Sequence, residues 1–315
     1  MRIATRQSTL ALIQAREVQT LLQQLYSFLD IELLPMSSRG DEILDRSLAE
    51  IGGKGLFIKT LEASLLKGEA DIAVHSLKDI PPTLDPEFKL AAVLPRLSAH
   101  DVLVSKKGKL SELPKGAIVG TSSVRRRAEL LNLRPDLQTI LIRGNVETRI
   151  RKMEEGLCDA IILAEAGLKR LGLADRITEV LPFDVFLPSV GQGVIAIEIL
   201  KDRQELSDLL APLNDPHTFA CITAERAMNA ALGASCTSPV GSFAEIKEAE
   251  LILRGAFFSS DGEIKFEVQE TGSAEEALAL GARAAKKLMK LIPQERRDSS
   301  LIKEDPSVAS RQLPY

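Results

Sequence analysis

The amino-acid sequence predicts an α/β fold with two similar lobes, a central cleft between them and a small α+β domain at the C-terminal end. Over the first two thirds of its 315 residues, short apolar runs alternate with helical patterns, which favours α/β sheets with mainly parallel strands. Two stretches, which open at residues 2–6 and at 101–105 or 117–122, each carry a strand, a serine-rich turn and a helix. This repetition indicates two related lobes.

The predicted strands of the lobes are short apolar runs bounded by polar or turn residues. They cover residues 2–6, 31–36, 71–76, 89–94, 101–105, 117–122, 137–142, 159–164 and 194–200. Helices are predicted where apolar side chains recur every three or four positions. They cover residues 10–25, 57–67, 124–133, 147–155 and 165–171. Polar residues follow most of these strands, where α/β proteins bind their ligands.

Two segments are predicted to carry the chain between the lobes. The proline-containing stretch 94–100 is a candidate hinge, and a second crossing is expected over 187–193. A length of 315 residues also exceeds a typical single domain. We therefore expect a first domain of residues 1–94 with 191–213, a second of 95–190 and a third of 214–315.

The third domain reads as a small α+β unit. A helix is predicted over 218–232, strands over 250–258 and 264–270, and a final helix over 274–291. The turn at 260–262 joins the two strands, which is a hairpin signal. The polar tail from residue 293 to 315 is expected to be loosely ordered.

Composition excludes several classes of partner. The net charge of −4 argues against nucleic acid, because proteins that bind it carry a broad basic surplus. No segment has the ~20 apolar residues that span a bilayer, and the N-terminal segment lacks the pattern of a secretory signal. We therefore expect a cytoplasmic protein with no membrane partner, and a monomer, since no heptad repeat is present.

The cysteines do not suggest a disulfide framework or a metal site. They are an odd count of 3 with no C-x-x-C spacing, and the 3 histidines are scattered, so no metal is expected. Cys158 and Cys221 fall in apolar contexts and are predicted to face the core. Cys236 lies in GASCTSPVG, a run of small and turn residues in which a thiol is accessible.

Arginines gather at two predicted strand-to-helix turns. Arg125 and Arg126 fall in the first turn of one helix, and Arg143 and Arg149 bracket the start of the next. The N-terminal end of a helix dipole is already positive and disfavours cations, so this placement indicates a bound anion with several negative charges. A solvated basic face without a ligand is the alternative interpretation.

A second polar cluster follows the predicted strand 71–76. Ser76, Lys78 and Asp79 come directly after its apolar run, which makes Asp79 a candidate acid, base or cation-stabilising group. The alternative is an Asp that caps a turn. His75 lies inside the run and is predicted to be a packed strand residue. The loop IGGKGLF supplies Lys54 but lacks the spacing of a nucleotide-binding P-loop.

Nine motifs occur together and in order along the chain. They are RIATRQS, GGKGLF, DIAVHSLKDIP, GTSSVRR, LIRGNVETR, DAIILAEAGLKRLGL, LPSVGQG, ITAERAMN and SCTSPVGS. With these motifs the chain closely resembles the porphobilinogen deaminase (hydroxymethylbilane synthase) family from residue 2 to about residue 291.

The resemblance implies a fold, a cofactor and a substrate. It implies two periplasmic-binding-protein-like lobes with a third domain, and a dipyrromethane cofactor joined to Cys236 by a thioether. The substrate is porphobilinogen, whose acetate and propionate would make the growing polypyrrole chain a string of carboxylates. The residues that the resemblance assigns to binding cofactor and substrate are Arg6, Ser8, Lys54, Ser76, Lys78, Thr121, Ser122, Ser123, Arg125, Arg126, Arg143, Gly144, Arg149, Arg170 and Gln192.

The implied reaction is that of a transferase in porphyrin and heme biosynthesis. Four porphobilinogen molecules condense head to tail with loss of ammonia, and hydrolysis releases the linear tetrapyrrole hydroxymethylbilane. Loss of ammonia leaves an electron-poor methylene-pyrrole cation. Asp79 aligns with the family's catalytic Asp, whose carboxylate accepts pyrrole N–H bonds and stabilises this positive charge.

Five positions depart from the family pattern. Thr9 stands where Pro is common, and Ala234 with Ser235 replaces a common Gly-Gly before the cysteine. Glu165 replaces a small residue, and Glu50 replaces a frequent Lys. The two acidic residues are expected to weaken carboxylate binding if they face the cleft.

A two-lobed binding protein for a small anion, without catalysis, is the alternative from another functional class. The two lobes and the arginine turns suit it equally. The missing secretory signal, the third domain and Cys236 argue against it.

Overall fold

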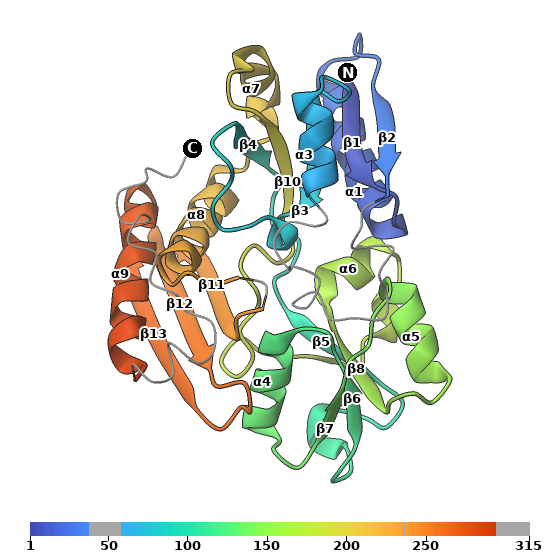
Figure 1. The fold of residues 1–315 in the computed structure, drawn as a ribbon, viewed down its shortest axis with the longest axis vertical. Coiled ribbons are helices and arrows are strands. Elements are labelled where there is room, and N and C mark those ends of the chain that lie inside the picture. Colours follow the sequence, from blue (N-terminus) through green and yellow to red (C-terminus); the bar gives the residue numbers. More distant parts are fainter. Residues whose placement is uncertain (38–57, 236, 294–315) are drawn as a thin grey trace.

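The computed structural model describes residues 1–37, 58–235 and 237–293, and every element below lies in these ranges. They form two five-stranded sheets and one three-stranded sheet. Figure 1 shows the two larger sheets one above the other, with the third sheet and its two helices beside them. The predicted α/β fold of two lobes and a small α+β domain is confirmed.

The first lobe is built on a sheet of order β2-β1-β3-β10-β4. Its strands are β1 (Arg2–Arg6), β2 (Glu32–Met36), β3 (Ile72–Ser76), β4 (Phe88–Val93) and β10 (Ile195–Leu200). Its helices are α1 (Thr9–Leu25), α3 (Lys59–Leu66) and α7 (Gln204–Leu210). Helix α7 was not predicted, because its seven residues are too short to show a clear helical period.

The second lobe repeats this arrangement in the order β7-β6-β8-β5-β9. Its strands are β5 (Asp101–Ser105), β6 (Ile118–Gly120), β7 (Gln138–Ile140), β8 (Ala160–Ala164) and β9 (Glu179–Val180). Its helices are α4 (Val124–Leu133), α5 (Val146–Glu154) and α6 (Glu165–Arg170). The short 3₁₀ helices of the described chain are η1 (Leu77–Asp79), η2 (Leu110–Glu112), η3 (Ala174–Arg176), η4 (Ala211–Leu213) and η5 (Ala274–Glu276).

Both lobe sheets are mixed, but four of the five strands in each run in the same direction, so the prediction of mainly parallel strands is confirmed. Strands β1, β2 and β3 pair in parallel, whereas β10 runs antiparallel to both β3 and β4. In the second lobe β5 is the strand that runs antiparallel to both neighbours. Strands β5 and β10 each follow a crossing from the other lobe. An apolar run does not record strand direction, which depends on where the connection enters the sheet.

The two crossings run side by side. Leu94 donates its N–H to the carbonyl of Ile195, and Leu97 donates to that of Gly193. Gly193 has a φ of +86°, and a Cβ on it would lie 1.9 Å from the carbonyl oxygen of Ser98. Only glycine permits this approach and this backbone conformation. The lobes are therefore joined by two adjacent segments rather than by one flexible link.

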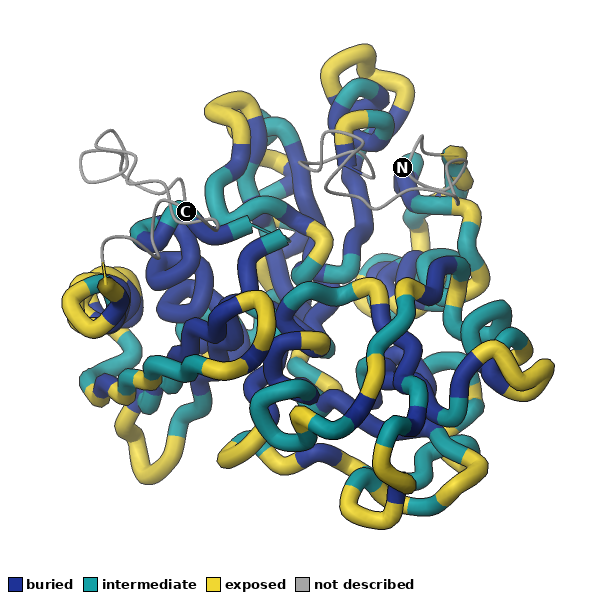
Figure 2. Tube along the Cα trace, turned by 60° about the horizontal axis from the view of Figure 1, so that its bottom comes forward, coloured by how far each residue is buried: buried dark blue, intermediate teal, exposed yellow. Residues whose placement is uncertain are grey.

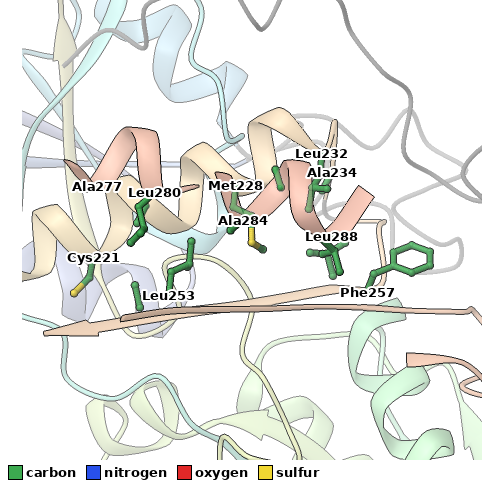
Figure 3. Packing of buried hydrophobic residues seen from close by; sticks show 14 of the residues in the cluster. Cys221, Met228, Leu232, Ala234, Leu253, Phe257, Ala277, Leu280, Ala284 and Leu288 are labelled. Carbon is green, nitrogen blue, oxygen red and sulfur yellow. The ribbon is translucent and has the colours of Figure 1, made fainter. Parts of the chain in front are cut away.

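The third domain packs two helices on one three-stranded antiparallel sheet. Its elements are α8 (Pro216–Ala231), β11 (Val240–Lys247), β12 (Glu250–Phe258), β13 (Lys265–Gly272) and α9 (Ala277–Leu291). Figure 3 shows α8 and α9 lying along the sheet, with Met228, Leu253 and Leu280 among the side chains that fill the space between them. The hairpin predicted between β12 and β13 is confirmed.

Strand β11 was missed because its sequence, VGSFAEIK, follows a run of small residues. It pairs with β12 through a tight turn whose two central residues, Glu248 and Ala249, have φ values of 49° and 70°. These left-handed conformations are typical of two-residue hairpins but are usually supplied by Gly, Asn or Asp. The sequence therefore carried no turn signal at this point.

Burial follows the three sheets. Figure 2 shows buried segments running through the centre of each domain and exposed segments in the loops on the outside. No helix in the described ranges is long and apolar enough to cross a membrane.

Candidate functional site

The end of β3 carries the predicted catalytic segment. Leu77 is buried and its N–H donates to the carbonyl of Val194, which fixes the turn against the residue that precedes β10. The 3₁₀ turn Leu77–Asp79 then places Lys78 and Asp79 beyond the strand end. Asp79 is exposed, as a side chain that meets a ligand must be.

A pocket in the first lobe surrounds this segment. Its lining residues are Arg6, Ser8, Leu10, Ala11, Gln14, Ile58, Val74, His75, Ser76, Lys78 and Asp79. The structure thus brings together five of the residues that the sequence predicted for the site. They are Arg6, Ser8, Ser76, Lys78 and Asp79.

Local contacts hold the polar residues of the pocket in place. Arg6 ends β1, and its Nη1 lies 3.5 Å from Oδ2 of Asp79. Ser8 caps α1, its Oγ accepting the N–H of Ala11. The amide of Gln14 lies 2.9 Å from Oγ of Ser76, a contact that the sequence did not reveal because the two residues are 62 positions apart.

His75 is buried as predicted, but it is not only a packing residue. Its Nε2 lies 2.9 Å from a carboxylate oxygen of Glu198 on the neighbouring strand β10. This pair fixes β3 against β10 directly behind the pocket.

Lys78, which lines the pocket, lies close to charged and polar residues of the second lobe and of the second crossing. Its Nζ lies 3.5 Å from Oε1 of Gln192 in the second crossing. Burial and then the positive charge of Arg126 lower the pKa of Lys78 to about 8, while Asp79 and Asp101 oppose this shift. The pocket of the first lobe therefore borders charged groups of the second lobe.

The arginine turn at the start of α4 already has an anion, and it is Asp101. The Asp101 carboxylate accepts from Arg125 Nη2 at 2.8 Å and from Arg126 Nε and Nη2 at 3.0 and 2.6 Å. Burial by itself would raise the pKa of Asp101, but the two guanidinium groups hold it below its usual range. The sequence argument for an anion at this helix start is correct in its physics. It did not identify an internal carboxylate as that anion.

Arg125 makes further contacts that tie α4 to the second crossing. Its Nη1 donates to Oε2 of Glu129 at 2.6 Å and to the carbonyl of Leu187 at 2.5 Å. Burial raises the pKa of Glu129 to about 8 despite the nearby Arg125. The other oxygen of Glu129 accepts the N–H of Leu187 at 2.9 Å. Arg125 is therefore placed as a structural cation, and it stays a proposal as a ligand contact.

Gln192 connects this network to the first crossing. It is completely buried, and its Nε2 lies 2.8 Å from the carbonyl of Ala99 and 2.9 Å from Asp101. Its Oε1 lies within reach of Arg126 and of Lys78. Gln192 therefore links both crossings, the buried arginine network and the pocket.

The second arginine turn, at the start of α5, differs from the first because its Arg149 lies among like charges. Arg149 donates its Nε to the carbonyl of Gly144 at 2.7 Å. Burial, then Arg126 and Arg143, lower the pKa of Arg149 to about 10, and Asp79 opposes them. Arg149 is thus a half-buried cation among like charges, and an anion bound here would relieve that repulsion.

The hydroxyl residues of β6–α4 have mainly local partners. Ser123 caps α4, its Oγ accepting the N–H of Arg126 at 3.3 Å. Thr121 is buried and its Oγ1 accepts the N–H of Ser123. Ser122 is exposed. The contact of these three with a ligand stays a prediction.

Comparison with known proteins identifies the family. A family model described as "Porphobilinogen deaminase, dipyromethane cofactor binding domain" matches residues 1–208, and one described as "Porphobilinogen deaminase, C-terminal domain" matches residues 219–290. The chain belongs to the porphobilinogen deaminase family.

Curated relatives agree over almost the whole chain. The porphobilinogen deaminase of Laribacter hongkongensis is 50% identical over 91% of this chain and 94% of its own length. That of Chromobacterium violaceum is 51% identical over 91% of this chain and 93% of its own length. Among solved structures, the periplasmic VFT2 domain of Bordetella pertussis BvgS is similar with a TM-score of 0.39 and 18% identity over 67% of this chain and 84% of that domain.

Two residues that the family pattern singles out, Lys54 and Cys236, lie outside the described residues, as does Glu50. The flanks of Cys236 are described, and Ser235 and Thr237 have their hydroxyl oxygens 2.7 Å apart. Of the other cysteines, Cys158 and Cys221 are buried as predicted, and burial raises the pKa of both, that of Cys221 to about 12. Burial and a raised pKa make both thiols poor nucleophiles.

Glu165, one of the two acidic residues that depart from the family pattern, is paired with other residues than the arginines proposed to bind substrate carboxylates. Its carboxylate accepts from Oγ of Ser98 in the first crossing and pairs with Lys169 on its own helix. Burial opposes ionisation, but Lys169 and Ser98 outweigh it and lower the pKa of Glu165. The side chain ties α6 to the first crossing. Helix α1 begins at Thr9 without the proline that is common there.

Proposed function

We propose that this protein is a transferase that condenses four porphobilinogen molecules head to tail, with release of ammonia, and hydrolyses off hydroxymethylbilane. Family membership supports the proposal. The observation that carries it in the structure is the meeting of cations from both lobes around one exposed carboxylate, Asp79. A chain of pyrrole acetates and propionates is an anion that fits this arrangement.

The donor set fits the dipyrromethane cofactor of the family. Lys78 and Arg149 have lowered pKa values because burial and neighbouring cations leave positive charge uncompensated, and the cofactor's carboxylates would compensate it. We propose that Arg6, Ser8 and Ser76 help to hold it and that Cys236 carries it through a thioether. When bound, the cofactor supplies the pyrrole on which the product is built.

The position of Asp79 supports its proposed catalytic role. Asp79 follows β3 directly, lines the pocket and lies beside Arg6. Its carboxylate can accept a pyrrole N–H and stabilise the positive charge that develops as ammonia leaves. The arginines and Lys78 bind and orient the substrate carboxylates, so that the reacting atoms meet in one geometry.

The finer assignments are part of the same proposal. The domain boundaries after residues 94, 190 and 213 are supported by the sheets, because β4 lies in the first sheet, β5 in the second and β11 in the third. We also propose a cytoplasmic monomer, and the net charge of −4 supports the expectation that it has no nucleic-acid partner.

Intact-protein mass spectrometry distinguishes the proposed transferase from the alternative, a non-catalytic anion-binding protein. We expect the purified full-length chain to be heavier than its sequence mass by one dipyrromethane, and we expect it to form hydroxymethylbilane from porphobilinogen. A Cys236→Ser variant should have the sequence mass. A wild-type chain of bare sequence mass that consumes no porphobilinogen would contradict the proposal.

The pKa of Lys78 predicts a pH dependence of substrate binding. Lys78 is charged below its pKa of about 8 and neutral above it, so it loses its attraction for carboxylates as the pH rises. We expect the KM for porphobilinogen to rise by up to about tenfold between pH 7.5 and 9, as the charged fraction falls by a similar factor.

Steady-state kinetics across this range test the assignment. In Lys78→Arg the rise should disappear, because an arginine stays charged. The exposed Lys67→Arg is the matched control and should keep the wild-type profile. A wild-type KM that does not change with pH would remove Lys78 from substrate binding.

A further inference from the structure

Arg170 joins the two lobes. It is the last residue of α6 in the second lobe, and its Nε lies 3.3 Å from Oε2 of Glu17 on α1 of the first lobe. Its Nη1 donates to the carbonyl of Gly193 in the second crossing, also at 3.3 Å. Helix α6 lies directly below α1 in Figure 1, and the two helices are in contact.

The ion pair lies on the face of α1 that also lines the pocket. Leu10, Gln14 and Glu17 are spaced four and three residues apart and so share one face of the helix. Leu10 and Gln14 line the pocket, and Gln14 contacts Ser76. Leu10 also packs on α6, where its Cδ2 lies 3.6 Å from the position of a Cβ on Gly167. Glu17 therefore lies on the same helix face as two residues of the pocket, one turn beyond Gln14.

Glu17 and Arg170 are unequally exposed. The Arg170 side chain is 7% exposed and that of Glu17 is 42% exposed. Burial lowers the pKa of Arg170 and the charge of Glu17 opposes that shift, so the carboxylate compensates a cation that has lost most of its water. A partly exposed ion pair is weak, and a ligand carboxylate can replace one of its members.

We propose that Glu17 is a positioning residue that holds Arg170 in place and competes with the carboxylates of the growing polypyrrole for it. The inference rests on the proposed function, in which Arg170 binds the chain. While the site holds few pyrrole carboxylates, Glu17 keeps Arg170 ordered and directed at the first lobe. A chain carboxylate that reaches Arg170 displaces Glu17, so Glu17 lowers the affinity for the chain.

Steady-state kinetics of Glu17→Gln test this competition. Loss of the competing charge should lower the KM for porphobilinogen about two- to fivefold without raising kcat, because the freed arginine binds the substrate carboxylates more tightly. A merely structural role would leave KM unchanged or raise it. Glu87→Gln, an exposed acidic residue of the same lobe, is the matched control and should behave as wild type.

A double-mutant cycle shows whether Glu17 acts through Arg170. In an Arg170→Gln background, Glu17→Gln should no longer change KM. A wild-type KM in the single variant, or an equal fall of KM in both backgrounds, would overturn the proposal.

Binding of citrate, measured by calorimetry, gives a readout that does not depend on turnover. The Glu17→Gln variant should bind this tricarboxylate about two- to fivefold more tightly than wild type. If neither wild type nor any variant consumes porphobilinogen, but Glu17→Gln still binds citrate more tightly than wild type, the proposed function fails and the competition for Arg170 stands. If wild type turns over normally but KM and citrate affinity are unaffected by the substitution, only the competition fails.

Discussion

Asp79→Asn is expected to lower kcat for hydroxymethylbilane formation by at least about 10²-fold, because the amide is neutral and cannot stabilise the developing pyrrole cation. The fold should be kept. Asp79 is exposed, and its contact with Arg6 is a long one of 3.5 Å. Single-turnover measurement of ammonia release and an unfolding curve on the same sample separate the two effects.

Asp85→Asn is the matched control, since Asp85 is an exposed aspartate of the same lobe that does not line the pocket. It should retain wild-type turnover. Product formation near the wild-type rate by Asp79→Asn would take the catalytic role away from Asp79, whatever its position in the pocket.

Among the substitutions proposed here, Asp101→Asn is expected to lower the stability of the protein most. The substitution removes the negative charge that compensates Arg125 and Arg126 in a buried site, and uncompensated buried charges are costly. We expect the free energy of unfolding to fall by about 3–5 kcal/mol, measured by urea denaturation at neutral pH.

Asp136→Asn provides the comparison, because Asp136 also pairs with an arginine but lies at the surface. Its effect should be much smaller. If Asp101→Asn lowers the free energy of unfolding no more than Asp136→Asn does, the buried arginines do not need the charge of Asp101 for stability. Partial restoration of Asp101→Asn by added citrate would show instead that a ligand anion can take its place.

The sequence predicted most of the fold because the fold depends on local periodicity. Strands such as Ile72–Ser76 and helices such as Val124–Leu133 were placed within a residue or two of their observed ends. The misses have a local cause as well. Helix α7 is too short to show a period, and the turn at Glu248 and Ala249 uses residues that seldom adopt left-handed conformations.

The candidate site was only partly predictable. Arg6, Ser76, Lys78 and Asp79 share a pocket, as polar residues at neighbouring strand ends should. Asp101 was missed, although an acidic residue that opens an apolar strand is an unusual signal. Its partner arginines are more than 20 positions away along the chain, and only the packing of α4 on the second sheet brings them to it.

The sequence by itself determined the elements, the family and the demand for negative charge at the arginine turns. These follow from spacing and from the helix dipole, which act over a few residues. The tertiary structure decided which anion meets which arginine: Asp101 for Arg125 and Arg126, and Glu17 for Arg170. Charges pair through space, and residues distant in the sequence become neighbours only when the lobes and their crossings have packed.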